Sequence, residues 1–333
     1  MAQPVKVVFG GNRIGNREPF TPSTDLGVAF DILTAHGVTT IDSAQNYNNS
    51  QATLGEVHAG ERFALDTKWG PPRTPGAAAS GPRQGPPGQG SPWATKEHIV
   101  NSAKDSIQKM GVLQVDIFYI HRPDPQTPIA ETLAGVQAVY EQGLFKRFGL
   151  SNYAAADVEA IYNHCKANNY VLPTVYQGTY SPITRFQEMA LFPTLRRLGM
   201  SFYAFSPSAG GFLGKTVAQV EASLKEPAPE GRGGPRSRRY AENPVFMKAL
   251  AQWNAVADME GVPSAELAYR YVAYHSALKR DLGDALIIGA GSLAQLEETL
   301  AAVEKGPLSA DAVAGANAVW DAMKDEPTAQ SRR

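Results

Sequence analysis

Short runs rich in β-branched and aromatic residues recur along this chain of 333 residues, and amphipathic helical patterns separate them over almost the whole length. Such alternation is typical of parallel strands that are joined by helical crossovers. Eight strands are expected, the number that closes a barrel, so the sequence predicts an α/β protein with a single-domain (β/α)8 architecture, the TIM barrel. The expected strands are residues 6–10, 38–42, 62–68, 115–121, 147–151, 174–177, 201–205 and 285–289.

The helical stretches between these strands begin with residues that commonly cap helices. Thr95 precedes the helical pattern before the fourth strand, and Thr127 with Pro128 precedes the pattern after it. After the eighth strand, Ser292 and Gln295 have the spacing of a capping box, in which each side chain bonds the other residue's amide. These start signals support the division into strand, loop and helix.

The composition is that of an ordinary globular protein. Hydrophobic residues make up 43% of the chain and charged residues 19%, and the formal net charge is -1. Neither nucleic acid nor a membrane surface is therefore expected as a partner. The single cysteine, Cys165, excludes an intrachain disulfide, and its helical spacing with Val158 and Ile161 favours a buried position. The chain shows neither a signal peptide nor a membrane-length apolar run, which predicts a cytoplasmic location.

Two stretches interrupt the alternation, and both follow strands. Residues 70–92, after the third strand, are so rich in Pro, Gly and Ala that we expect a long mobile loop at the barrel mouth. Residues 226–239, after the seventh strand, combine Pro and Gly with several arginines, which is typical of a solvated loop or of a flap that grips an anion. The flap as a whole is expected over residues 215–240. The barrel is expected over residues 1–326, and residues 327–333 are expected to form a disordered tail.

Four polar residues lie at or just after the ends of successive strands, where reactive groups lie in such barrels. Asp42 ends the second strand, Tyr47 lies in the loop after it, Lys68 ends the third and His121 ends the fourth. Each has an ordinary structural explanation when it is taken alone, such as helix capping, packing, solvation or a satisfied core histidine. Together they form a set that can transfer a proton.

The chemistry of this set depends on the lysine. A tyrosine hydroxyl, with a pKa of about 10, is a poor acid at neutral pH unless a nearby cation stabilises its phenolate. Lys68 is the expected cation, and Asp42 would balance its charge in a desolvated site. His121 would then hydrogen-bond the carbonyl oxygen of a substrate opposite the phenol.

Several further segments make the chain resemble the aldo-keto reductase superfamily, in particular its aflatoxin-aldehyde reductase branch. They are IDSAQNY, GLSNY, TVYQGTYSP, YAFSPSAGG and IIGAGSLAQLEE, and with Lys68 and His121 the resemblance runs from about residue 7 to 323. The resemblance implies an NADPH-dependent aldehyde or ketone reductase with a catalytic tetrad of Asp42, Tyr47, Lys68 and His121, with Tyr47 as general acid. It also implies a homodimer.

The same resemblance implies a set of cofactor contacts. Ser151, Asn152 and Gln177 would bond the nicotinamide carboxamide, Phe205 would stack on the ring, and Ser206 would begin the pyrophosphate cradle. Lys215 and Arg232 would belong to the flap over the cofactor. The full expected set is Gly10, Gly11, Asp42, Ser151, Asn152, Gln177, Phe205, Ser206, Pro207, Ser208, Gly210, Lys215, Arg232, Gly289, Gln295 and Glu298.

Departures from the branch's pattern concern the adenosine end of the cofactor. Gly291 and Ser292 stand where paired serines are usual, and Thr299 replaces a usual asparagine. The small-molecule carbonyl substrate is expected to contact Tyr47, Trp69 and His121, which would form an aromatic floor.

Two alternatives from other functional classes remain. One is a regulatory subunit that binds the cofactor with little turnover, although such a subunit need not keep a complete tetrad. The other is a metal-dependent barrel hydrolase, which is disfavoured because only His121 is expected at a strand end. No metal is therefore expected. A dinucleotide fingerprint of the G-x-G-x-x-G kind is also missing after the first strand.

Overall fold

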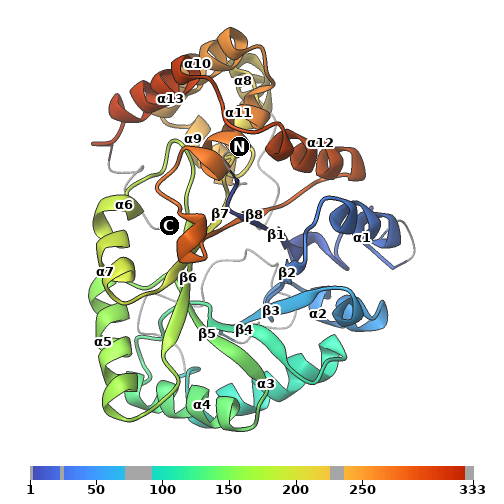
Figure 1. Ribbon diagram of the computed structural model, residues 1–333, viewed down its shortest axis with the longest axis vertical. Coiled ribbons are helices and arrows are strands. Elements are labelled where there is room, and N and C mark those ends of the chain that lie inside the picture. Colours follow the sequence, from blue (N-terminus) through green and yellow to red (C-terminus); the bar gives the residue numbers. More distant parts are fainter. Residues whose placement is uncertain (1–2, 23–25, 72–91, 226–235, 327–333) are drawn as a thin grey trace.

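The strands form a closed parallel barrel in chain order from β1 to β8, which confirms the predicted fold (Figure 1). The computed structural model describes residues 3–22, 26–71, 92–225 and 236–326. The ring closes where β1 pairs with β8, with Val8 opposite Ile287. The strands are β1 Lys6–Gly10, β2 Thr40–Asp42, β3 Ala64–Trp69, β4 Val115–Ile120, β5 Phe145–Ser151, β6 Pro173–Thr179, β7 Ser201–Phe205 and β8 Ala285–Ile288.

The helices surround the barrel, and the figure shows them as a ring outside the strands. Helices α10 and α13 pack against each other at one side, and α12 contacts α1. The helices are α1 Leu26–Ala35, α2 Ser50–Glu56, α3 Lys96–Met110, α4 Ile129–Glu141, α5 Ala155–Ala167, α6 Gln187–Ala190, α7 Phe192–Arg197, α8 Val217–Lys225, α9 Arg236–Ala241, α10 Pro244–Glu260, α11 Ser264–Tyr274, α12 Leu293–Glu304 and α13 Ala310–Asp321.

The predicted helix starts are confirmed at α3 and α12 and wrong at α4. The Thr95 hydroxyl accepts from the His98 amide, and the Ser292 hydroxyl accepts from the Gln295 amide. Gln295 completes only part of the box, because its side chain accepts from the Gly291 amide instead of from Ser292. At α4 the cap is Pro128, since the Thr127 hydroxyl is already bonded to Asp124 and to the Ala94 amide.

The barrel interior contains aromatic and polar side chains as well as aliphatic ones. A buried cluster there contains Val8, Ile117, Tyr119, Val175, Tyr203, Ala285 and Ile287. The Tyr119 ring lies where β5 has Gly149, and a Cβ on that glycine would lie 2.2 Å from the ring. A larger cluster fills the space between the strands and the helices. It includes Cys165, which is buried as predicted, and burial raises the pKa of its thiol to about 12.

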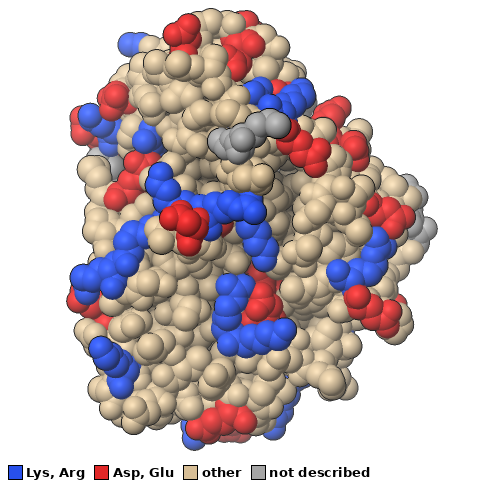
Figure 2. Space-filling view, in the orientation of Figure 1, with Lys and Arg blue, Asp and Glu red and all other residues tan. Residues whose placement is uncertain are grey.

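The surface carries charges of both signs. On the face that Figure 2 shows, basic side chains run across the middle with acidic ones among them and around the rim. Within the described ranges, no helix is both long and apolar enough to cross a membrane.

Candidate active site

Asp42 and Lys68 form a buried ion pair at the carboxyl-terminal ends of β2 and β3. The Lys68 Nζ donates to Asp42 Oδ2 at 2.5 Å and to the Ser43 carbonyl at 2.8 Å. The lysine side chain is 0% exposed and the aspartate side chain 3%. Burial alone would lower the pKa of Lys68, but the charge of Asp42 and the Tyr47 hydroxyl reverse this, and the pKa is raised. The pair therefore holds an ammonium ion in a buried site.

Tyr47 lies directly against this ammonium ion. Lys68 hydrogen-bonds the Tyr47 hydroxyl, and its Nζ lies 4.8 Å from the centre of the ring. The loop that carries Tyr47 is fixed to the barrel, because the Ser43 and Gln45 amides donate to the Asp66 and Lys68 carbonyls. The Asn16 side-chain amide donates to the Tyr47 carbonyl at 2.8 Å. Asn16 is a supporting residue that the sequence analysis missed.

His121 faces Tyr47 from the end of β4. The two rings are 6.1 Å apart between centroids and nearly perpendicular, at 81°. The His121 Nδ1 is buried without a hydrogen-bond partner among the described residues. Burial, and then the charges of Lys68 and Arg122, lower the pKa of His121 well below its usual value. The imidazole is therefore neutral at physiological pH, and the structure brings all four tetrad residues together.

Gly70 allows the chain to leave β3 beside His121. A Cβ at this position would lie 2.8 Å from the Asn46 side-chain amide and 3.3 Å from the His121 Cβ. Only a glycine fits without displacing one of these neighbours. The predicted loop of residues 70–92 begins here, but most of it, residues 72–91, lies outside the described residues.

Trp69 points to the outer side of the barrel wall, because successive strand residues alternate and Lys68 points inward. Its ring is 1% exposed and lies 4.8 Å from Trp93 and 5.9 Å from His98 between centroids. Trp93 is the more exposed ring of the pair, and its amide donates to Asp124, just beyond β4. Trp93, which the sequence analysis missed, is therefore the partly exposed ring of this pair.

The residues that are expected to bind the nicotinamide carboxamide lie at or near the carboxyl-terminal ends of β5 and β6. Asn152 has a positive φ of 65°, and its side-chain amide donates to the His121 carbonyl and to the Ser151 hydroxyl. Gln177 donates to Asp42 Oδ1 at 2.9 Å. Asn152 and Gln177 are thus bonded to the tetrad directly and Ser151 through Asn152. Gln177 fixes the carboxylate that balances the charge of Lys68.

The loop after β7 has the backbone geometry of an anion cradle. Ser206, Ala209, Gly210 and Gly211 all have positive φ angles. The amides of Ala209 and Gly211 close turns within the loop, whereas no described backbone carbonyl accepts from Ser208 or Gly210. Phe205, at the strand end, packs against the apolar cluster inside the barrel. Backbone amides in such a turn, when they have no carbonyl partner, suit phosphate oxygens.

A tyrosine that the sequence analysis missed links this loop to α12. The buried Tyr269 hydroxyl is hydrogen-bonded to both Ser208 and Thr299. Thr299, which departs from the branch's pattern, is therefore a structural partner of the β7 loop.

The remaining expected cofactor residues surround the same mouth. Gly10 and Gly11 have little room for a side chain, since a Cβ on either would lie about 3.1–3.2 Å from the carbonyl of Ile288 or Asp42. Gly289, Gln295 and Glu298 are exposed after β8 and on α12. Pro207 is buried, and Lys215 begins the flap segment after Gly214. Arg232, in the flap, and the tail of residues 327–333 lie outside the described residues.

The other histidines lie away from strand ends, as predicted, at positions 36, 58, 98, 164 and 275. The described part of the chain contains no cluster of three His, Cys, Asp or Glu side chains that could hold a metal ion.

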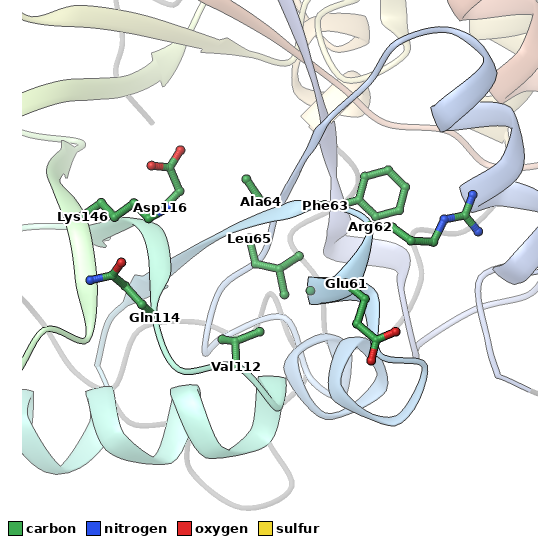
Figure 3. Close-up of a pocket in the computed structure, with 10 residues that line it drawn as sticks. Glu61, Arg62, Phe63, Ala64, Leu65, Val112, Gln114, Asp116 and Lys146 are labelled. Atoms are coloured by element: carbon green, nitrogen blue, oxygen red, sulfur yellow. The ribbon is translucent and has the colours of Figure 1, made fainter.

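A separate cavity of about 310 Å³ opens at the opposite end of the barrel (Figure 3). Its lining includes Leu65, Val112, Asp116 and Lys146, which lie near the starts of β3, β4 and β5. Reactive groups in these barrels occupy the carboxyl-terminal ends of the strands, so this cavity is not the catalytic site.

A sequence model of the Aldo/keto reductase family matches residues 6–321. The chain belongs to the aldo-keto reductase family. An aldo-keto reductase of Pseudocercospora fijiensis is 37% identical over 301 residues, which cover 88% of this chain and 97% of that protein. Aflatoxin B1 aldehyde reductase member 2 of Rattus norvegicus is 38% identical over 250 residues, 71% of this chain and 67% of the relative.

A third relative covers nearly the whole reductase. Oxidoreductase sirO of Leptosphaeria maculans is 34% identical over 334 residues, which cover 98% of this chain and 96% of that protein. The reductase is therefore an oxidoreductase that reduces carbonyl groups, and its family uses nicotinamide cofactors.

Proposed function

We propose that this enzyme reduces an aldehyde or a ketone to an alcohol with NADPH, and that Tyr47 is the general acid. The contact between Lys68 and Tyr47 carries the proposal. A buried ammonium ion, held by Asp42, stabilises negative charge on the phenol when its proton leaves. The neutral His121 ring, facing Tyr47, can donate a hydrogen bond to the substrate oxygen.

The residues at the mouth fit a nicotinamide cofactor. The β7 loop contains amides that donate to no described backbone carbonyl and could bind phosphate oxygens. Gly10 and Gly11, which carry no side chains, would let a cofactor approach the backbone at this end of the barrel. When bound, the cofactor supplies hydride to the carbonyl carbon. Asp42, Tyr47, Lys68 and His121 then orient the carbonyl group and supply the proton to its oxygen.

The preference for NADPH is proposed from positive charge near the adenosine end. Arg13 lies beside the loop after β8, since its guanidinium is 3.7 Å from the position of a Cβ on Gly291. Lys215 lies at the start of the flap segment. A 2′-phosphate carries a charge that NADH lacks, and such cations favour it through charge-assisted hydrogen bonds.

The substrate class is a small carbonyl compound. Relatives are named as aflatoxin B1 aldehyde reductases, and the Tyr47 ring offers apolar surface beside two hydrogen-bonding groups, its own hydroxyl and the His121 imidazole. We therefore propose aldehydes as the preferred substrates, with aromatic aldehydes among them.

The test is the oxidation of NADPH, followed by absorbance, with aromatic, aliphatic and carboxylated aldehydes. Tyr47→Phe should bind NADPH like the wild type and lose about 100- to 10,000-fold in kcat, because it lacks only the transferable proton. Wild-type turnover in this variant would refute the role of Tyr47. Tight binding of NADPH without turnover of any aldehyde would instead favour a regulatory subunit.

A further inference from the structure

We propose that Asp66, which lies below the tetrad on β3, carries a proton in the working enzyme and acts as a positioning residue that leaves Lys68 with a single negative partner. This inference rests on the proposed function for its catalytic consequence. The protonation of Asp66 itself can be tested without any activity.

The sheet register places Asp66 directly beside Asp42. The two residues are partners across the parallel pair of β2 and β3, and neighbouring strands lie about 4.8 Å apart. Both are buried, with relative exposures of 0% for Asp66 and 2% for Asp42. Two buried carboxylates at such a separation repel each other strongly, and one of them generally keeps its proton.

The nearby ammonium ion is committed to the other carboxylate. Lys68 gives one hydrogen bond to Asp42 Oδ2 and one to the Ser43 carbonyl, and it also bonds the Tyr47 hydroxyl. Among the residues that the structure describes, Asp66 accepts a hydrogen bond only from the Ile117 amide, on Oδ1 at 3.1 Å. An ionised Asp66 would be a buried carboxylate with a single neutral hydrogen-bond donor, which costs free energy. Of the two carboxyl groups, Asp66 should therefore be the one that keeps its proton.

Three buried oxygens on adjacent strands lack hydrogen-bond partners within the described part of the chain. They are Asp66 Oδ2, the Thr40 hydroxyl on β2 and the Tyr119 hydroxyl on β4. An ionised Asp66 would accept from its neighbours but could donate nothing. A protonated Oδ2 adds a donor, and because none of the three groups lies within hydrogen-bond distance of another, a buried water molecule would have to bridge them.

Charged and titratable groups face Asp66 from most of the barrel. They are Lys6 on β1, Asp42 on β2, Asp116 and Tyr119 on β4, Arg147 on β5 and Tyr203 on β7. Lys68 lies two residues further along β3 and so points to the same side of the strand as Asp66. Arg147 is held by Asp116 at 2.7 and 3.2 Å and by Tyr203 at 3.3 Å. Burial, and then the charges of Asp42 and Asp116, raise the pKa of Asp66 well above its usual value.

The catalytic consequence follows from charge balance. A neutral Asp66 leaves one carboxylate facing one ammonium ion, and the field of Lys68 then acts on Tyr47. An ionised Asp66 would place a second negative charge near Lys68 in a medium of low dielectric constant, and would oppose the formation of a phenolate.

The first experiment is infrared spectroscopy of the full-length protein at pH 7.5, in H2O and D2O. The spectrum of the Asp66→Asn variant is subtracted from that of the wild type. The difference spectrum should contain the carbonyl stretch of a protonated carboxyl group, and this band should shift in D2O. The matched control is Asp116→Asn, which removes the carboxylate bound to Arg147 and should show the loss of carboxylate bands. If the Asp66→Asn variant instead lacks carboxylate bands that the wild type has, Asp66 is ionised in the wild type and the proposal is wrong.

A second measurement protects against a variant that fails to fold. In wild-type protein with 13C-labelled aspartate carboxyl groups, one resonance should stay at the position of a neutral carboxyl at pH 7.5. A spectrum in which every aspartate is ionised would refute the inference.

The pH profile of kcat tests the positioning role. Asp66→Asn is the neutral isostere, so the alkaline limb of its profile should overlie that of the wild type. A limb displaced to lower pH would mean that the variant had removed a real negative charge, and would contradict the proposal. If the protein reduces no carbonyl compound but the infrared band is present, the proposed function fails while the protonation of Asp66 stands.

Discussion

The Lys68 ammonium ion lies 2.5 Å from Asp42 Oδ2, and neither side chain is more than 3% exposed. The pair joins β2 to β3 at the mouth of the barrel and places a positive charge against Tyr47. Each charge stabilises the other, because removing one of them would leave the other buried without a counter-charge.

Breaking the pair from one side should cost both activity and stability. Asp42→Asn leaves the buried lysine unpaired, which typically destabilises a protein by about 3–5 kcal/mol. The double variant Asp42→Asn/Lys68→Met should lose less free energy of unfolding than the sum of the two single variants, as a double-mutant cycle by chemical denaturation would measure. Additive losses would show that the two charges act independently.

His121 should remain neutral well below pH 6.5. Its pKa in the folded protein is lowered by burial and by the charges of Lys68 and Arg122, whereas the unfolded chain titrates near 6.5. As the pH falls below 6.5, His121 binds a proton in the unfolded state but not in the folded state. The free energy of unfolding therefore falls by up to about 1.4 kcal/mol per pH unit.

The check is the free energy of unfolding between pH 7 and pH 5. His121→Gln should lose less stability on acidification than the wild type, whereas His164→Gln, on α5, serves as the control. Equal acid sensitivity in the wild type and His121→Gln would contradict a neutral imidazole. Nitrogen NMR of the His121 ring would report the same state directly.

Much of the site was predictable because strand ends are visible in the sequence. Asp42, Lys68 and His121 stand out as polar residues at the ends of expected strands, and a closed barrel must bring such ends to one mouth. Asp66 escaped notice because nothing local distinguishes it. Its neutral state depends on Asp42, a lateral neighbour on another strand, and on where the Lys68 ammonium ion is bonded.

Other differences also have tertiary causes. The sequence around Thr127 carries a sound capping signal, but Asp124 and the Ala94 amide compete for its hydroxyl. The outward direction of Trp69 follows from strand alternation once Lys68 is known to point inward, so that feature was within reach. The position of Trp93 was not, because it depends on how the chain returns to Asp124.

Asp66→Asn should stabilise the protein, and increasingly so as the pH rises. The folded pKa of Asp66 is raised by burial and by Asp42 and Asp116, whereas the unfolded chain titrates near 3.9. Below pH 4 both states hold the proton. Above it, the unfolded state releases the proton while the folded state keeps it, so the wild type loses up to about 1.4 kcal/mol per pH unit until the folded pKa is reached.

The measurement is the unfolding free energy of both proteins from pH 4.5 to pH 7.5. The advantage of Asp66→Asn should widen with pH, while Asp116→Asn should destabilise the protein because it leaves Arg147 without its carboxylate. An advantage that narrows with pH would show that the folded protein holds Asp66 as a carboxylate.

Arg13→Gln should weaken the binding of NADPH more than the binding of NADH. The guanidinium of Arg13 lies beside Gly291, where the chain departs from the branch's paired serines, and Gln295 caps the same turn. A hydrogen bond to a charged group contributes about 1.5–3 kcal/mol, so the Kd of NADPH should rise roughly 10- to 100-fold, with that of NADH nearly unchanged. Fluorescence titrations at one ionic strength measure both constants.

Arg17→Gln is the matched control, since it removes a neighbouring charge that the structure does not place against Gly291. An equal loss of affinity for both cofactors would remove Arg13 from the 2′-phosphate site, and a selective loss in Arg232→Gln alone would assign that site to the flap.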